Sequence, residues 1–127
     1  MLELKNIADT LERAFLEGRA TPQFSASGRF SVEDGYRVQR LGFEKALSRG
    51  EHLAGYKMGL TSRAKQRDVQ VFEPIHGYLL KSFEIEKNGT FTMERKIHPR
   101  VEPEIAIVLK HGLSGPGVTV RDVENAL

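Results

Sequence analysis

The apolar residues of this chain follow two patterns, and the change between them at Glu51 limits the folds that the chain can adopt. Before Glu51 they recur every three or four residues, a spacing that predicts amphipathic helices. After it, Gly and Pro recur and the apolar runs shorten to the length of strands. The sequence therefore predicts an α+β fold in which an N-terminal helical segment, residues 1–50, packs on a β-rich body, residues 51–127.

Local signals mark where the helices begin and end. The first helix is expected over Leu2–Glu17 with Gly18 as its stop, and the second begins after Ser31, the first residue of a short capping box. One or two helical turns are expected over residues 62–68. A last helix opens at Thr119.

Short apolar runs predict the strands of the body. They span residues 53–60, 75–80, 83–85 and 101–109. The turn signal Asn88-Gly89 between apolar flanks predicts a hairpin that leads to Phe91 and Met93. The run over 101–109 has the strongest strand pattern, because its second half is apolar on both faces, as in a buried strand.

Net charge and cysteine content narrow the function classes. The 127 residues hold 19 Lys and Arg against 17 Asp and Glu, a formal charge of +2. Because no basic run recurs along one face, we expect no nucleic-acid partner. No apolar run approaches about 18 residues, so no membrane partner is expected. Cysteine is absent, which excludes disulfides and thiolate chemistry and favours a location in the reducing cytoplasm.

Two glutamates separated by one residue are the candidate metal ligands. Alternate side chains of a strand share a face, so Glu102 and Glu104 point the same way, with Cβ atoms about 7 Å apart. Two carboxylates at that spacing can converge on one hard divalent cation. Pro103 between them cannot donate a ladder hydrogen bond, which favours an edge strand, a strand start or a bulge. The alternative is that both glutamates lie on a solvated face at a strand end.

A lysine lies between two glycines in the first predicted strand. Strand alternation places Lys57 on one face with Gly55 and Gly59, while the other face carries apolar side chains. Glycine in a strand often marks the close approach of a ligand, and an ammonium group there can bind a substrate carboxylate or stabilise an enolate. A surface lysine on a glycine-rich edge strand is the competing interpretation. His98, just before Pro99, either lines the same cleft or belongs to a turn.

Several segments occur together in a specific order and spacing. They are Lys57-Met-Gly-Leu-Thr-Ser62, Phe72-Glu-Pro74-Ile-His-Gly77-Tyr-Leu79, Ile97-His-Pro-Arg-Val-Glu102-Pro-Glu104-Ile-Ala106 and Leu113-Ser-Gly-Pro-Gly117. Together they resemble the oxalocrotonate decarboxylase and 2-hydroxypentadienoate hydratase family of the fumarylacetoacetate hydrolase superfamily. The resemblance implies a β-roll with N-terminal helices packed against it. This chain would form the N-terminal half, truncated at residue 127.

The resemblance also implies a site. Lys57 matches the active-site lysine of the family. Glu102 and Glu104 match two of three carboxylates that hold Mg²⁺ or Mn²⁺, and the third lies past the end of this chain. The positions expected to bind substrate are Gly59, Leu60, Ser62 and His98.

The implied activity is metal-dependent decarboxylation of an unsaturated 2-oxo diacid of the 4-oxalocrotonate type, in aromatic meta-cleavage catabolism. The segments Lys57–Ser62 and Ile97–Pro99 resemble those of the decarboxylases more than those of the hydratases. Two alternatives stay open: 2-hydroxypenta-2,4-dienoate hydration, and a non-catalytic half-subunit or truncated fragment. Two carboxylates with water would hold Mg²⁺ weakly, so full activity is not expected from this chain alone. The family also implies a homo-oligomer and complexes of decarboxylase with hydratase.

Overall fold

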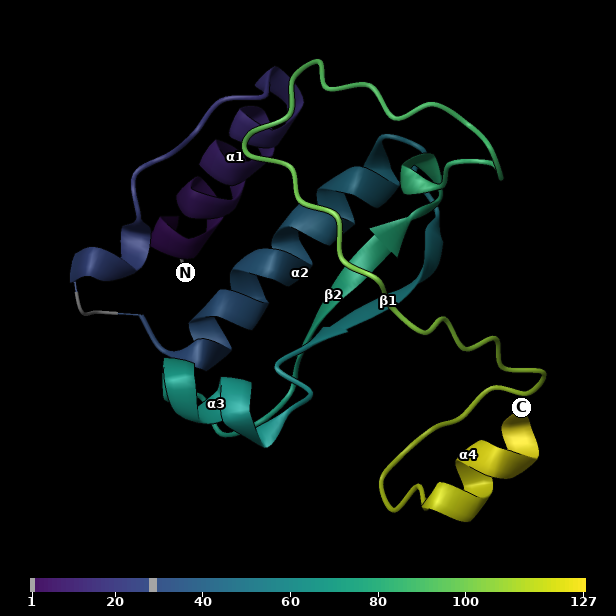
Figure 1. Ribbon diagram of the computed structural model, residues 1–127. Helices are drawn as coiled ribbons and strands as arrows, with labels where there is room; N and C mark the ends of the chain where they lie inside the picture. Colours follow the sequence, from purple (N-terminus) through teal and green to yellow (C-terminus); the bar gives the residue numbers. More distant parts are fainter. Residues whose placement is uncertain (1, 28–29) are drawn as a thin grey trace.

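The chain combines helices with one small antiparallel sheet, the expected α+β mixture, in a computed structural model that describes residues 2–27 and 30–127. Figure 1 shows the elements in chain order. They are α1 (Leu2–Glu17), the 3-10 turn η1 (Phe24–Ser27), α2 (Val32–Ser48), β1 (Leu53–Gly59), α3 (Arg63–Val69), β2 (Ile75–Leu80), the 3-10 turn η2 (Lys81–Phe83) and α4 (Val120–Ala126).

Helices α1 and α2 pack through the apolar stripes that their spacing predicted. Ile7 and Ala8 of α1 are buried against Val38 of α2. Partly buried apolar residues surround this cluster: Leu4, Phe24, Phe30 and Leu41. Ion pairs join the same helices, since Lys45 Nζ lies 2.6 Å from Asp9 Oδ1. The main apolar cluster of the chain therefore lies between the two N-terminal helices.

The capping signals predicted from the sequence are confirmed at both long helices. Ser31 Oγ accepts a hydrogen bond from the Asp34 N–H at 3.1 Å, and Asp34 Oδ2 accepts one from the Ser31 N–H at 3.2 Å. This reciprocal capping box satisfies two N–H groups that the first turn of α2 leaves without helical partners. At the C-terminal end of α1, Gly18 has a φ of +64°, the left-handed conformation that stops a helix.

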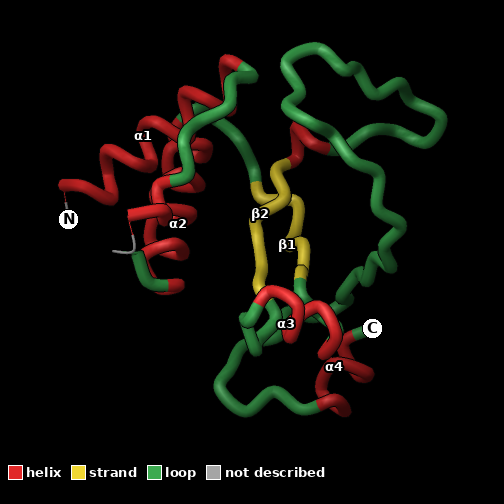
Figure 2. Tube along the Cα trace, turned by 60° about the vertical axis from the view of Figure 1, so that its left-hand side comes forward, coloured by secondary structure: helices red, strands yellow, loops and turns green. Residues whose placement is uncertain are grey.

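The register of β1 and β2 assigns their side chains to two faces. Tyr56 lies opposite Tyr78 on one face, and Lys57 lies opposite Gly77 on the other. Figure 2 shows α2 on one side of this pair and the long segment after residue 90 on the other. The register therefore places Lys57 on the face of the sheet opposite to the one that carries Tyr56 and Tyr78.

Helix α2 covers the hydrogen-bonding edge of β2. The His76 N–H donates to Tyr36 Oη at 3.3 Å, and Gln39 Nε2 donates to the His76 carbonyl oxygen at 2.9 Å. Phe43 stacks on Tyr78 with ring centroids 4.0 Å apart. A covered edge cannot pair with a further strand, so α2 closes this side of the sheet.

Three expected strands are corrected by the structure. Residues 81–83 form η2 in place of a strand over 83–85, and Asn88 (φ +67°) lies at a turn without flanking strands. The segment 101–109 is not a strand, and Val101 and Ile105 are 99% and 92% exposed. A strand needs a neighbour to receive its hydrogen bonds, and among residues 2–27 and 30–127 no strand pairs with these segments.

The last helix, α4, lies apart from α1 and α2 (Figure 1). Thr119 Oγ1 caps it by accepting from the Asp122 N–H at 3.2 Å, as the sequence predicted. The Lys110 N–H donates a backbone hydrogen bond to the Ala126 carbonyl oxygen near the end of the helix, at 2.7 Å. Across the described ranges, no helix is both long enough and apolar enough to cross a membrane.

Candidate active site

The lysine and the two glutamates singled out in the sequence meet at one place. Lys57 Nζ lies 2.5 Å from Glu104 Oε1 and 3.4 Å from Glu102 Oε2. Lys57 comes from the middle of β1, and the glutamates come from the long segment that crosses the sheet on the side away from α2 (Figures 1 and 2). Tertiary structure therefore joins two motifs that stand 47 residues apart in the sequence.

Three glycines lie next to Lys57, and they differ in how much space is open where a side chain would be. A β-carbon at Gly55 would have no other heavy atom within 4 Å, so the open space predicted beside Lys57 is present there. A β-carbon at Gly59 would lie 3.1 Å from the Ile75 side chain, which indicates a packing role. Gly77, opposite Lys57 on β2, was not among the predicted site residues, because only the strand register brings it there.

A buried glutamine holds the turn that follows β1. Leu60 has a φ of +52°, and its carbonyl oxygen accepts a hydrogen bond from Gln66 Nε2 at 2.8 Å. Gln66 is only 6% exposed, a burial that the charged sequence of α3 does not signal. Ser62 Oγ accepts from the Lys65 N–H at 3.2 Å and so caps α3. These contacts account structurally for Leu60 and Ser62, whose role in substrate binding stays a prediction.

His98 has the geometry of a turn residue. It is exposed and has a φ of +52°, a conformation that His adopts in turns more readily than most residues. Within the described part of the chain, no hydrogen bond or ion pair joins His98 to Lys57 or to either glutamate. The contact of His98 with substrate therefore stays a proposal, because the conformation of His98 in this structure does not bring it to Lys57 or the glutamates.

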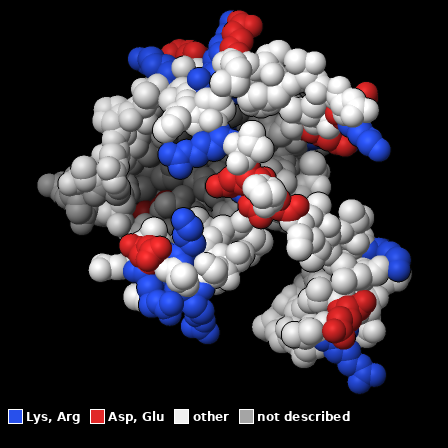
Figure 3. Space-filling model, viewed as in Figure 1, with Lys and Arg blue, Asp and Glu red and all other residues white. Residues whose placement is uncertain are grey.

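The carboxylates hold Lys57 in its charged form. The hydrogen bond from Nζ to Glu104 raises the pKa of Lys57 above its usual 10.5, and Glu102 raises it further, while partial desolvation opposes both. The side chains are 45% exposed for Lys57, 62% for Glu102 and 58% for Glu104. One ammonium between two carboxylates leaves a local charge of −1, open to solvent. Elsewhere on this face of the molecule, acidic and basic side chains are interspersed (Figure 3).

The glutamate pair fits a divalent cation but supplies only part of a coordination shell. Oxygens of both carboxylates converge on one ammonium, so they already face a single cation position. Hard oxygen ligands of this kind suit Mg²⁺ and Mn²⁺. In residues 2–27 and 30–127, no three His, Cys, Asp or Glu side chains lie together as a metal site. Glu102 and Glu104 could therefore hold such an ion only with water or a further ligand.

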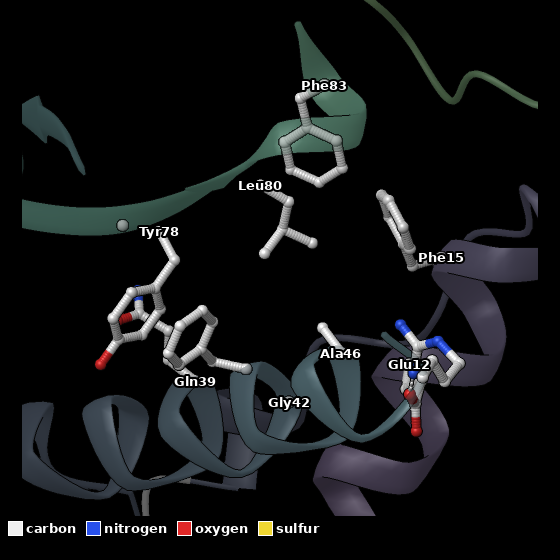
Figure 4. A pocket seen from close by; sticks show the side chains of 11 residues that line it. Glu12, Phe15, Gln39, Gly42, Ala46, Tyr78, Leu80 and Phe83 are labelled. Carbon is white, nitrogen blue, oxygen red and sulfur yellow. Dashed lines mark ion pairs between the residues drawn. The ribbon is translucent and has the colours of Figure 1, made fainter. Parts of the chain in front are cut away.

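An apolar pocket of about 310 Å³ lies between the N-terminal helices and the end of β2, and Lys57 is not among the residues that line it. Figure 4 shows Phe15, Tyr78, Leu80 and Phe83 pointing into it. Its charged lining residues, Glu12 and Arg49, form an ion pair with each other. Because this lining lacks a free charged group, the pocket does not offer the chemistry that is present around Lys57.

Comparison with known proteins finds relatives with two activities. The chain is 36% identical over 114 residues to a 4-oxalocrotonate decarboxylase from Pseudomonas sp., covering 90% of this chain and 44% of the relative. It is 37% identical over 122 residues to a 2-hydroxypent-2,4-dienoate hydratase from Pseudomonas putida, covering 94% and 55%. No family model matches the chain.

The fold is similar to that of a solved decarboxylase. The 4-oxalocrotonate decarboxylase from Pseudomonas putida G7, complexed with calcium and acetate, matches with a TM-score of 0.93 and 33% identity. The match covers 98% of this chain and 48% of that protein, so the chain spans about half the length of its relatives. The chain is therefore related to the family of 4-oxalocrotonate decarboxylases and 2-hydroxypentadienoate hydratases, and it resembles the N-terminal half of these proteins.

Proposed function

We propose that this chain supplies the active-site lysine and two metal-binding carboxylates of a metal-dependent decarboxylase that acts on an unsaturated 2-oxo diacid of the 4-oxalocrotonate type. The observation that carries the proposal is the contact of Lys57 with both Glu104 and Glu102. The similar decarboxylase from Pseudomonas putida G7 was also solved with magnesium and adipate, a divalent cation and a six-carbon dicarboxylate. Both ligands have the chemistry that these three side chains can bind.

The reaction needs a sink for one electron pair. In the substrate, the remote carboxylate is joined through a methylene and a double bond to the 2-oxo group. When its carbon–carbon bond breaks and CO₂ leaves, the electron pair moves through the double bond to the 2-oxo oxygen. A Mg²⁺ or Mn²⁺ ion held by Glu102 and Glu104 would supply Lewis-acid stabilisation of that charge.

The residues of this chain would position and stabilise the substrate. The ammonium of Lys57 would bind a substrate carboxylate or the developing oxyanion. The free space at Gly55 would admit the substrate beside it. Gly59, Leu60 and Ser62, at the end of the same strand, are proposed to line that space.

Hydration of 2-hydroxypenta-2,4-dienoate is the second candidate, favoured by the hydratase relative, which is 37% identical to this chain against 36% for the decarboxylase. A hydratase would use the same dienolate but protonate it and add water, so the same three side chains would serve. The experiment is to incubate the protein with Mg²⁺ and each substrate and to identify products by mass spectrometry. Release of CO₂ without a hydrated product is expected, and a hydrated product alone would contradict the decarboxylase.

A third candidate is that the chain is a non-catalytic half-subunit of a larger assembly, as a homo-oligomer or a decarboxylase–hydratase complex. The exposed apolar side chains of Val101, Ile105 and Val108 favour it, because such surface is normally covered by a partner. Light scattering would test for an oligomer. Absence of both reactions from the folded chain would favour this candidate. The cytoplasmic location stays an expectation from the absence of cysteine.

A further inference from the structure

We propose that Lys57 acts as an internal counter-cation for the glutamate pair, which a divalent metal must displace before Glu102 and Glu104 can bind it. This inference rests on the proposed function, because it takes the two glutamates to be metal ligands. It adds to that function an exchange of the Lys57 ammonium for a divalent metal at the two glutamates. The ammonium would keep the carboxylates together without metal, and the metal would release the ammonium.

Geometry makes the two cations competitors. Lys57 Nζ contacts Glu104 Oε1 at 2.5 Å and Glu102 Oε2 at 3.4 Å, so it occupies the position on which both carboxylates converge. A metal bound to the same oxygens would place a dication within about 4 Å of the ammonium, where like charges repel. Both cations therefore cannot use the pair in this arrangement.

The structure also provides a place for the displaced lysine. The Lys57 side chain is 45% exposed, so solvent reaches it and the metal can approach without opening the fold. On the same face of β1, a β-carbon at Gly55 would contact no other heavy atom within 4 Å. A long flexible side chain can turn into that space at little cost. Once released, the ammonium is free to bind a substrate anion, so metal is expected to bind before the anion.

Manganese binding to the full chain tests the exchange, with the paramagnetic relaxation of water protons as the measurement. Lys57→Met changes the local charge from −1 to −2 and removes the competitor, so Mn²⁺ should bind about fivefold more tightly than in the wild type. Lys57→Arg keeps a cation at the pair and should bind like the wild type. Lys81→Met is the matched control, because Lys81 pairs with Glu84 and its loss changes net charge equally. The control should change affinity less than twofold.

Two outcomes overturn the exchange: an affinity in Lys57→Met equal to or below that of the wild type, or an equal increase in Lys81→Met. A second measurement does not depend on a variant. Nuclear magnetic resonance of lysine ammonium groups should show the Lys57 signal shift as Mg²⁺ is added, and an unchanged signal at saturating Mg²⁺ overturns the exchange.

Variants of the glutamates separate this inference from the proposed function. If Glu102→Gln and Glu104→Gln together leave Mn²⁺ affinity unchanged, the metal site itself is wrong and the proposed function fails. If they weaken Mn²⁺ binding but Lys57→Met does not strengthen it, only the exchange fails. Weaker binding in the double variant and tighter binding in Lys57→Met support both.

Discussion

Replacing Gln66 with leucine should destabilise the turn that follows β1, although the two side chains have similar size. The amide donates at 2.8 Å to the Leu60 carbonyl oxygen, and Gln66 is 6% exposed. A hydrogen bond of this kind contributes about 1 kcal/mol, and a partly buried carbonyl left unpaired costs about 1–3 kcal/mol. Release of Leu60 from its left-handed conformation (φ +52°) returns about 1 kcal/mol. The free energy of unfolding should therefore fall by about 1–3 kcal/mol.

Urea unfolding followed by circular dichroism measures this loss. Lys65→Ala, at an exposed position of the same helix, is the control and should change stability by less than about 0.5 kcal/mol. A double-mutant cycle tests the cause: in a Leu60→Gly background the turn no longer carries strain, so Gln66→Leu should change stability by a different amount. Equal losses for Gln66→Leu and Lys65→Ala would refute the argument that this hydrogen bond holds the turn.

Three further predictions concern the caps and the glycines. The hydrogen bond from the Ser31 hydroxyl, and after it the one from the Ser31 N–H, lowers the pKa of Asp34 below its usual 3.8. The Asp34 carboxylate therefore contributes to stability above pH 3.8, and this contribution is lost as the pH falls through the lowered pKa of the folded state. Asp34→Asn should therefore lower the thermal midpoint more at pH 7 than at a pH below 3.8, and an equal difference at both pH values would contradict the cap. Gly18→Ala should lower the free energy of unfolding in urea by about 1–3 kcal/mol, because φ is +64° and a β-carbon would lie 2.6 Å from the Arg95 Cα. An unchanged free energy of unfolding would refute this close approach. Gly55→Val should leave the thermal midpoint within a few degrees of the wild type but abolish turnover. Retained activity would show that the substrate does not use the space beside Lys57.

Local signals in the sequence were sufficient for most of the helices and for the paired strands. The cap at Ser31 and the left-handed Gly18 are decided by residues within one turn of each other, so periodicity and capping rules placed α1 and α2 correctly. The strands over 53–60 and 75–80 were predicted within one residue of β1 and β2. The extra residue, Leu60, leaves the strand because Gln66 holds it in a left-handed conformation, a contact that the pattern does not contain.

The strand expected over 101–109 shows where pattern reasoning ends. Alternation predicts which side chains could share a face, but a strand exists only where a neighbour accepts its hydrogen bonds. Among residues 2–27 and 30–127 no strand lies beside this segment, and Ile105 is 92% exposed although its position in the pattern predicted burial. The same reason accounts for the missing hairpin after Asn88.

The sequence by itself determined the helices, their caps, the two paired strands and the residue types of the candidate site: a lysine between glycines and two glutamates separated by one residue. Tertiary structure decided that these groups meet, that Gly77 lies opposite Lys57, and that Gln66 is buried beneath the turn. Local elements depend on residues a few positions apart, whose interactions the sequence order already specifies. Contacts across 47 residues depend on strand register and on the path of the connecting segment, which only the folded chain defines.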